Sequence, residues 1–212
     1  MEKIWLQQYP ALVPHTIDVS AYGSLVELLD EAFTKHRDKV AYRFMGKSIT
    51  FAEVDRWSAA LGAYLQSLGL KKGDRVAAML PNVPQYPVAI AAILRAGFVL
   101  VNVNPLYTPR ELKHQLHDSG AKAIVILENF ATTLQQVAAE VPTKHVIVAA
   151  MGDLLGLKGL LVNHVVRKVK KLVPPYALAG AVSFKDALIK GARMKLASVK
   201  SMPDDLAVLQ YT

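Results

Sequence analysis

Residues 75–103, RVAAMLPNVPQYPVAIAAILRAGFVLVNV, decide how this chain folds. They comprise a short apolar run, a longer periodic stretch that Gly97 closes, and a second apolar run. Both runs are apolar on both faces and do not alternate, which is typical of strands in a parallel sheet that helices cover on each side. This unit therefore predicts an α/β fold with a mostly parallel sheet.

The same alternation of apolar runs and periodic stretches continues in both directions. We expect strands at 75–80, 98–103, 121–127, 145–150 and 206–211, and a small hairpin at 40–51 that turns at Gly46. Four hydroxyl residues, each followed three positions later by a carboxylate, predict helix starts. These pairs are Ser24/Glu27, Thr50/Glu53, Thr108/Glu111 and Ser183/Asp186.

Glycine and proline indicate where helices end and begin. Pro109 suits a first helical residue, which needs no N–H donor. Four glycines follow periodic stretches and are expected in the left-handed conformation after a helix. They are Gly69, Gly97, Gly120 and Gly191.

The length and composition narrow the class of protein. A chain of 212 residues suits one domain, or one domain with an excursion. The absence of cysteine excludes disulfides, thiolate metal sites and a cysteine nucleophile. The first ten residues lack the pattern of a secretory signal, and the longest apolar run, 87–103, is interrupted by Arg95 and Gly97. We expect a cytoplasmic protein that does not span the membrane.

The net charge of +8 belongs to residues 153–203, which contain ten Lys or Arg and two Asp. We interpret 153–203 as a basic amphipathic excursion within a single domain, 1–212. At helical spacing, residues 157–173 place seven apolar side chains on one face and basic side chains on the other. Two alternatives carry equal weight: the apolar face packs on the sheet, or the helix rests on anionic lipid. Nucleic-acid binding is not expected, because regularly interleaved aromatics are absent from this segment.

Three stretches, in order, resemble motifs of the adenylate-forming, AMP-binding enzymes. They are SITFAEV at 48–54, ILRAGFVLVNVNP at 93–105 and the terminal LAVLQYT at 206–212. Longer segments, 70–82, 85–89 and 102–125, resemble the bacterial long-chain fatty-acid:CoA ligases in particular. The resemblance covers nearly the whole chain, and the order and spacing of the motifs make it specific.

The resemblance implies a two-step reaction that uses ATP, Mg²⁺ and CoA. A long-chain fatty acid attacks the α-phosphate of ATP to give acyl-adenylate and pyrophosphate, and the CoA thiol then displaces AMP. In the family, a glycine-rich loop presents N–H groups to the phosphates. By position, Tyr211 and Thr212 stand just before and at the start of that loop, and Thr212 would contact Mg²⁺. The sequence stops there, so we expect no ligase activity from this chain alone and assign no catalytic residue.

Several polar residues have a structural interpretation beside the functional one. His114, His117 and Asp118 lie at helical spacing, which is more typical of a solvated helix face than of a metal site. Asn102, Asn104 and Pro105 suit a sharp turn after a buried strand, at the edge where α/β proteins bind ligands.

Other functions also stay open at this stage. An unpaired sheet edge could form a homodimer, and the basic segment could make peripheral contact with the inner face of the cytoplasmic membrane. The acyl substrate could also differ from a long-chain fatty acid.

Overall fold

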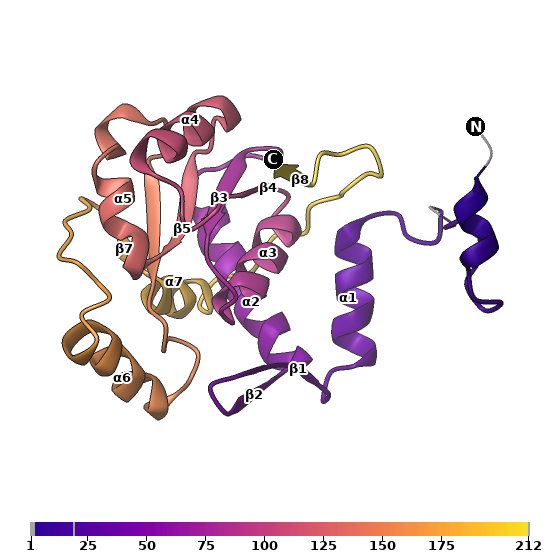
Figure 1. Ribbon diagram of the computed structural model, residues 1–212, viewed down its shortest axis with the longest axis horizontal. Coiled ribbons are helices and arrows are strands. Elements are labelled where there is room, and N and C mark those ends of the chain that lie inside the picture. The colour runs from indigo at the N-terminus through magenta and orange to yellow at the C-terminus, as the bar shows by residue number, and fades with distance from the viewer. Residues whose placement is uncertain (1–2, 19, 212) are drawn as a thin grey trace.

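The computed structural model describes residues 3–18 and 20–211. Its centre is a six-stranded parallel sheet with the order β7-β6-β5-β3-β4-β8 (Figure 1). The strands are β3 (Arg75–Met79), β4 (Val99–Asn102), β5 (Ala123–Leu127), β6 (His145–Ala149), β7 (Val182–Ser183) and β8 (Val208–Gln210). All five predicted strands are present, and their parallel pairing is confirmed. The additional strand β7 has only two residues, too few to leave a periodic pattern.

Helices cover both faces of the sheet, as predicted. The α-helices are α1 (Leu25–Lys35), α2 (Phe51–Ser67), α3 (Gln85–Arg95), α4 (Pro109–Ser119), α5 (Ala131–Gln135), α6 (Leu157–His164) and α7 (Phe184–Gly191). Short 3₁₀ turns are η1 (Ile4–Gln8), η2 (Glu128–Phe130) and η3 (Ala138–Glu140), and a π-helical turn, η4 (Val165–Val169), continues α6. The segment that contains η1 projects away from the body of the molecule (Figure 1).

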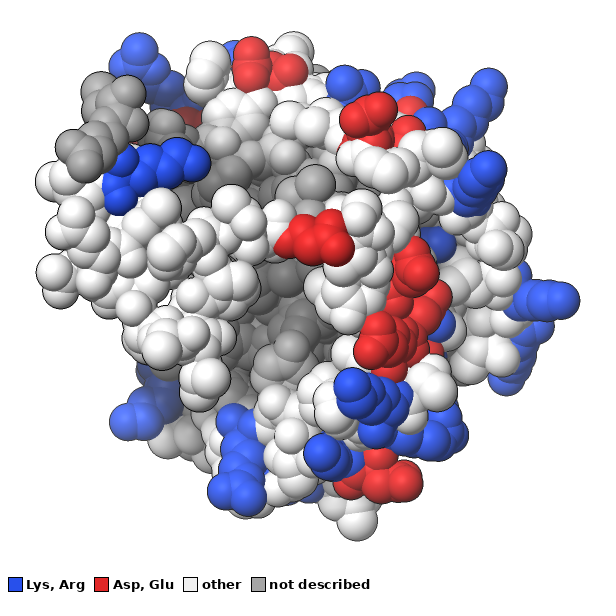
Figure 2. Space-filling model, turned by 90° about the vertical axis from the view of Figure 1, so that its right-hand side faces the viewer, with Lys and Arg blue, Asp and Glu red and all other residues white. Residues whose placement is uncertain are grey.

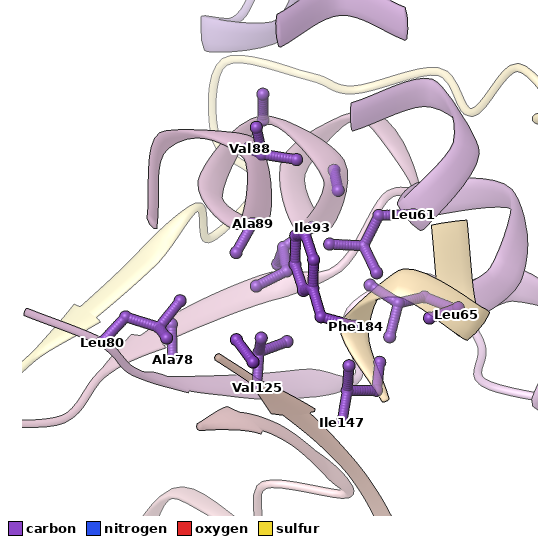
Figure 3. Close-up of a cluster of buried hydrophobic side chains, with 14 of the residues drawn as sticks. Leu61, Leu65, Ala78, Leu80, Val88, Ala89, Ile93, Val125, Ile147 and Phe184 are labelled. Atoms are coloured by element: carbon purple, nitrogen blue, oxygen red, sulfur yellow. The ribbon is translucent and has the colours of Figure 1, made fainter. Parts of the chain in front are cut away.

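The core consists of two apolar clusters, one on each face of the sheet. One cluster joins α2, α3 and α7 to alternate residues of the central strands, and Phe184 of α7 lies fully buried among them (Figure 3). The other cluster packs Leu112 and Leu116 of α4, with Leu134 of α5, on the intervening strand residues. Val76 and Ala78 therefore face one layer while Ala77 faces the other, so the strands are apolar on both sides.

The four predicted helix starts are confirmed. Ser24, Thr50, Thr108 and Ser183 each accept a hydrogen bond from the backbone N–H three residues later. Thr50 and Glu53 form a reciprocal capping box, because the Glu53 carboxylate also accepts the Thr50 N–H at 2.9 Å. Thr108 and Glu111 form the same reciprocal box at α4, where Pro109 is the first helical residue.

The hairpin at residues 40–51 is confirmed. It consists of β1 (Val40–Phe44) and β2 (Lys47–Thr50), which pair antiparallel. Met45 and Gly46 both have positive φ, 46° and 76°, which is typical of a tight two-residue hairpin turn.

The prediction for Gly191 is wrong, whereas those for Gly69, Gly97 and Gly120 are confirmed by positive φ. Gly191 lies inside α7 without positive φ, at the crossing with α2. A Cβ at Gly191 would lie 1.8 Å from the carbonyl oxygen of Ala60. Close approach of two helix backbones, and not a left-handed turn, therefore requires glycine here.

One prediction about burial is also wrong, and one of the two alternatives for residues 157–173 is not observed. Strand β8 lies at the edge of the sheet, and Val208 is 37% exposed, so this strand is not covered on both faces. The predicted apolar face of residues 157–173 does not pack on the sheet, because of its seven side chains only Val166 is buried. Among the described residues, no helix is long and apolar enough to cross a membrane.

Candidate functional site

The carboxyl ends of the central strands form the candidate site. Strand β3 has β4 on one side and β5 on the other. The chain therefore passes from β3 to β4 in one direction and then crosses back from β4 to β5 on the other side of β3. In open parallel sheets, ligands bind outside the carboxyl ends of the strands at such a switch point. Residues 80–82, 102–105 and 128–130 follow β3, β4 and β5 at this edge.

A cavity of about 720 Å³ opens at this edge. Its polar lining comes mainly from the segments that follow β3, β4 and β8, and Phe130 closes one side. The polar side chains that line it are Asn82, Tyr86, Asn102, Asn104, Tyr107, Gln210 and Tyr211. None of the described lining residues is charged. The cavity is therefore suited to hydrogen bonding with a polar ligand and offers no general base of its own.

A chain of side-chain hydrogen bonds ties the strand ends together. The Tyr86 hydroxyl donates to Asn102 Oδ1 at 2.7 Å, and Asn102 Nδ2 donates to Gln210 Oε1 at 2.8 Å. Gln115 of α4 donates through Nε2 to the Asn102 carbonyl at 2.6 Å. Asn102 therefore links α3, α4, β4 and β8, and fixes the direction in which the chain leaves β8.

Tyr211 continues this arrangement one residue beyond β8. Its hydroxyl donates to Asp118 Oδ2 of α4 at 2.5 Å. Burial, followed by the hydrogen bond to the Asp118 carboxylate, raises the pKa of Tyr211 to about 12. The hydroxyl is thus a donor at neutral pH that holds the strand end against α4. Thr212, the other predicted binding residue and the predicted metal contact, lies outside the described residues.

The predicted and observed contributions to this edge differ in one respect. Asn102, Asn104 and Pro105 line the cavity as expected, and Asn104 Oδ1 accepts the Leu106 N–H at 3.0 Å in the predicted sharp turn. Sequence reasoning missed Tyr86, Gln115 and Gln210. Gln115 is only 1% exposed, but a polar glutamine on an amphipathic helix gives no sequence signal of burial.

His117 and Asp118 of α4 each contact another group of the protein. A ring nitrogen of His117 lies 2.5 Å from the Glu140 carbonyl, and Asp118 accepts from Tyr211. Within residues 3–18 and 20–211, no group of three or more His, Cys, Asp or Glu side chains is placed to hold a metal ion.

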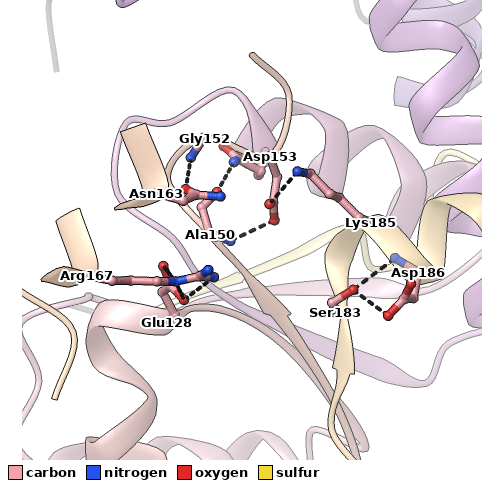
Figure 4. Close-up of polar contacts among 10 residues, drawn as sticks. Glu128, Ala150, Gly152, Asp153, Asn163, Arg167, Ser183, Lys185 and Asp186 are labelled. Carbon is pink, nitrogen blue, oxygen red and sulfur yellow. Dashed lines mark hydrogen bonds and ion pairs between the residues drawn. The ribbon is translucent and has the colours of Figure 1, made fainter. Parts of the chain in front are cut away.

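A second polar cluster lies where β5 and β6 end (Figure 4). The Glu128 carboxylate, 2% exposed, accepts two hydrogen bonds from Arg167 Nε at 2.9 and 3.0 Å. Asp153 accepts the Ala150 N–H at 2.7 Å, and burial raises the pKa of this carboxyl. Lys185 Nζ lies 3.7 Å from Asp153. This cluster anchors the segment that follows β6.

Comparison with known proteins assigns the class. The model of the AMP-binding enzyme family matches residues 29–212, so the chain belongs to that family.

The chain is also similar to a narrower group of enzymes. The chain is 53% identical over 214 aligned residues to a long-chain-fatty-acid–CoA ligase from Escherichia coli O157:H7, and 54% identical to one from Salmonella typhimurium. A ligase of the same name from Bacillus subtilis is 32% identical. Each alignment covers the whole of this chain, which spans 38% of the length of these curated relatives.

Solved structures confirm the fold. An anthranilate CoA ligase in complex with anthranoyl-AMP superposes with a TM-score of 0.73 at 18% identity, over 92% of this chain and 34% of that one. A long-chain-fatty-acid-CoA ligase from Archaeoglobus fulgidus gives 0.66 at 22% identity, over 89% and 34%.

Proposed function

We propose that this chain is the N-terminal part of an ATP-dependent long-chain fatty acid–CoA ligase. The reaction joins a fatty acid to CoA through an acyl-adenylate and releases AMP and pyrophosphate. The observation that carries the proposal is the identity of more than 50% along the whole chain to ligases of that name. The polar carboxyl edge supports it, because β8 ends there at the residues that precede the phosphate loop in the family.

The proposal requires ATP, Mg²⁺ and CoA as ligands of the whole enzyme. When bound, Mg²⁺ would neutralise phosphate charge during attack on the α-phosphate. The part of this chain in that chemistry is positional. Tyr211 holds the end of β8 against Asp118, and Asn102 holds Gln210, so the end of this strand is fixed. Thr212 is the residue that we assign to the phosphate and Mg²⁺ contact.

An exchange of segments tests the proposal. In the Escherichia coli O157:H7 ligase, the aligned stretch would be replaced by this chain, and the hybrid supplied with palmitate, ATP and CoA. We expect palmitoyl-CoA, AMP and pyrophosphate in equal amounts, and no activity from the isolated chain. Acetate and benzoate in place of palmitate would separate long-chain specificity from ligase activity in general.

The Asn102→Ala hybrid tests the role of the strand edge. This change removes the links to Tyr86 and Gln210, so we expect slower pyrophosphate release with little change in folding. The matched control is Lys144→Ala, an exposed residue on the amino side of β6. A folded hybrid with the natural chain that releases no pyrophosphate with any acid would refute the proposed function.

We also propose that the protein forms a homodimer. In the described part of the chain, no strand pairs with the outer edge of β8, and apolar side chains of the N-terminal segment are exposed, Leu12 by 97%. Light scattering across a range of concentrations tests this proposal. A monomer at every concentration would contradict it.

The proposed location is the cytoplasm, with reversible contact at the inner face of the cytoplasmic membrane. Support comes from the basic excess of residues 153–203 and from the substrate class, because long-chain fatty acids partition into bilayers. Fractionation of cells at low and high salt tests this location. A protein that never sediments with membranes at low salt would contradict the peripheral contact.

A further inference from the structure

The segment α6–η4 is attached to the body by polar contacts and glycines. Asn163 Oδ1 accepts the Gly152 N–H at 2.7 Å, and a Cβ on Gly159 would lie 1.9 Å from the Gly152 carbonyl oxygen. Arg167 pairs with buried Glu128 on the same side (Figure 4). The inner side of the segment therefore carries glycine, asparagine and arginine, with Val166 as its one buried large apolar residue.

Much of the apolar surface of this segment consequently faces outward. Val166 is buried and Val162, Val165 and Val173 are half-buried, but five large apolar residues are more than half exposed, unlike those of a helix that packs its apolar stripe on a sheet. They are Leu157 (88%), Leu160 (62%), Leu161 (64%), Val169 (63%) and Leu172 (55%). We call these five residues, together with Lys158, Lys168, Lys170 and Lys171, the α6 face.

The lysines of the α6 face lack acidic partners. Lys168, Lys170 and Lys171 are exposed, and none lies within 4.0 Å of a carboxylate among the described residues. Lys158 bonds to the carbonyl of Met45 at the hairpin tip, and the Met45 side chain is itself 45% exposed. The α6 face therefore continues onto the hairpin, and both lie at the same end of the molecule (Figure 1).

We propose that the α6 face is the surface on which this protein docks on an anionic lipid bilayer. The inference rests on the proposed peripheral location and names the surface and the lipid class. Exposed leucines next to unpaired lysines match the boundary between acyl chains and phosphate head groups. On the side that carries the N-terminal segment, by contrast, acidic and basic side chains are interspersed (Figure 2).

The positions of these charges also determine which side of the segment would face the bilayer. Because Glu128 neutralises Arg167 on the inner side, the free positive charge of the segment lies outward with the leucines. Burial of an apolar stripe on lipid and attraction of lysine to lipid phosphate then act in the same direction. A protein partner for this face would need a matching acidic and apolar groove, whereas a bilayer that contains anionic lipid supplies both features without further assumptions.

Vesicle flotation of the purified chain tests the assignment. The vesicles are phosphatidylcholine with and without phosphatidylglycerol. We expect binding only with phosphatidylglycerol and at low salt. Replacing Lys168, Lys170 and Lys171 by Gln should lower the partition coefficient by about a hundredfold at low salt. Replacing Leu157 and Leu161 by Ser should lower it by about tenfold or more.

Two control variants make the same kinds of change, in charge or in exposed apolar surface, outside the α6 face. A triple change of exposed lysines elsewhere, Lys39, Lys144 and Lys190 to Gln, removes the same charge, and Ile189→Ser removes an exposed apolar side chain from α7. Both controls should float nearly as the natural chain does. All substituted side chains are largely exposed, and circular dichroism would verify that each variant is folded.

A labelled cysteine gives a second readout, since the chain contains no cysteine. An environment-sensitive dye at Leu161→Cys should shift to the blue with phosphatidylglycerol vesicles, whereas a dye at Ile189→Cys should not. A shift at Leu161→Cys without vesicles that depends on protein concentration would mean that a second copy covers the face, and would overturn the proposal.

The outcomes distinguish the proposed docking surface from the proposed peripheral location. If the natural chain binds anionic vesicles and the α6-face variants bind equally well, the surface assignment fails and the peripheral location stands. If the natural chain floats with neither vesicle, both fail. Neither result bears on ligase activity in the hybrid enzyme.

Discussion

Replacement of Gly191 by alanine is the most direct test of how α7 and α2 pack against each other on one face of the sheet. The added Cβ would lie 1.8 Å from the Ala60 carbonyl oxygen and 3.1 Å from the Tyr64 Cβ, both on α2. Real Cβ atoms essentially never approach other heavy atoms within 3.0 Å, so α7 must move away from α2. Phe184 and Ala187, which are fully buried on α7, would move with it.

The expected cost follows from these contacts. Overpacking of a core costs about 1–3 kcal/mol, and the obstacle here is backbone that cannot rotate aside. Complete loss of the Phe184 contacts would set an upper bound of about 3–5 kcal/mol. Alanine recovers about 1 kcal/mol through its better helix propensity. We therefore expect Gly191→Ala to lower the free energy of unfolding by about 3 kcal/mol.

Urea unfolding followed by circular dichroism measures this change, with an unchanged m-value as the sign of a simple loss of stability. Lys190→Ala, on the exposed side of the same helix, is the control and should stay within about 0.5 kcal/mol of the natural chain. Gly191→Asn distinguishes the two explanations. Asparagine tolerates a left-handed cap, so a cap would favour Asn over Ala, whereas close packing makes Asn at least as harmful. A loss below about 1 kcal/mol for Gly191→Ala would refute the packing argument.

Three further predictions concern single side chains. Arg95→Met should lower the free energy of unfolding by about 2 kcal/mol in urea titrations, because Arg95 is 15% exposed and its 2.9 Å ion pair with Asp55 would be lost. An unchanged free energy of unfolding would contradict this prediction. Thr50→Ala should cost about 1 kcal/mol through the lost cap of α2, and Thr50→Ser should restore most of it. For Tyr211, the raised pKa means that its hydrogen bond to Asp118 stabilises the fold fully below pH 10 and loses that effect as the pH rises towards 12. Tyr211→Phe should therefore remove one tyrosine that titrates near pH 12 in an absorbance titration, and an unchanged titration curve would count against the assignment.

Much of the fold follows from the sequence by itself, because its signals are local. A hydroxyl and a carboxylate three residues apart define a helix start through contacts within one turn, so Thr50/Glu53 and Thr108/Glu111 were predictable. Runs such as 76–80 predict buried parallel strands, because strands covered on both faces are typically apolar along their whole length. The position of Asn102 and Asn104 at the carboxyl edge follows from the same strand assignment.

Only the tertiary structure decided which elements lie at an edge and which faces meet. Strand β8 is as apolar as the inner strands, but the sheet order leaves it exposed. Gly191 looks like a helix cap until α2 is placed 1.8 Å from its missing Cβ. The periodicity of 157–173 indicates an amphipathic helix, yet Gly159 and Asn163 lie on the buried side and leave Leu161, Val169 and Leu172 exposed. Periodicity records which residues share a face, whereas contacts between segments distant in the chain determine what that face meets.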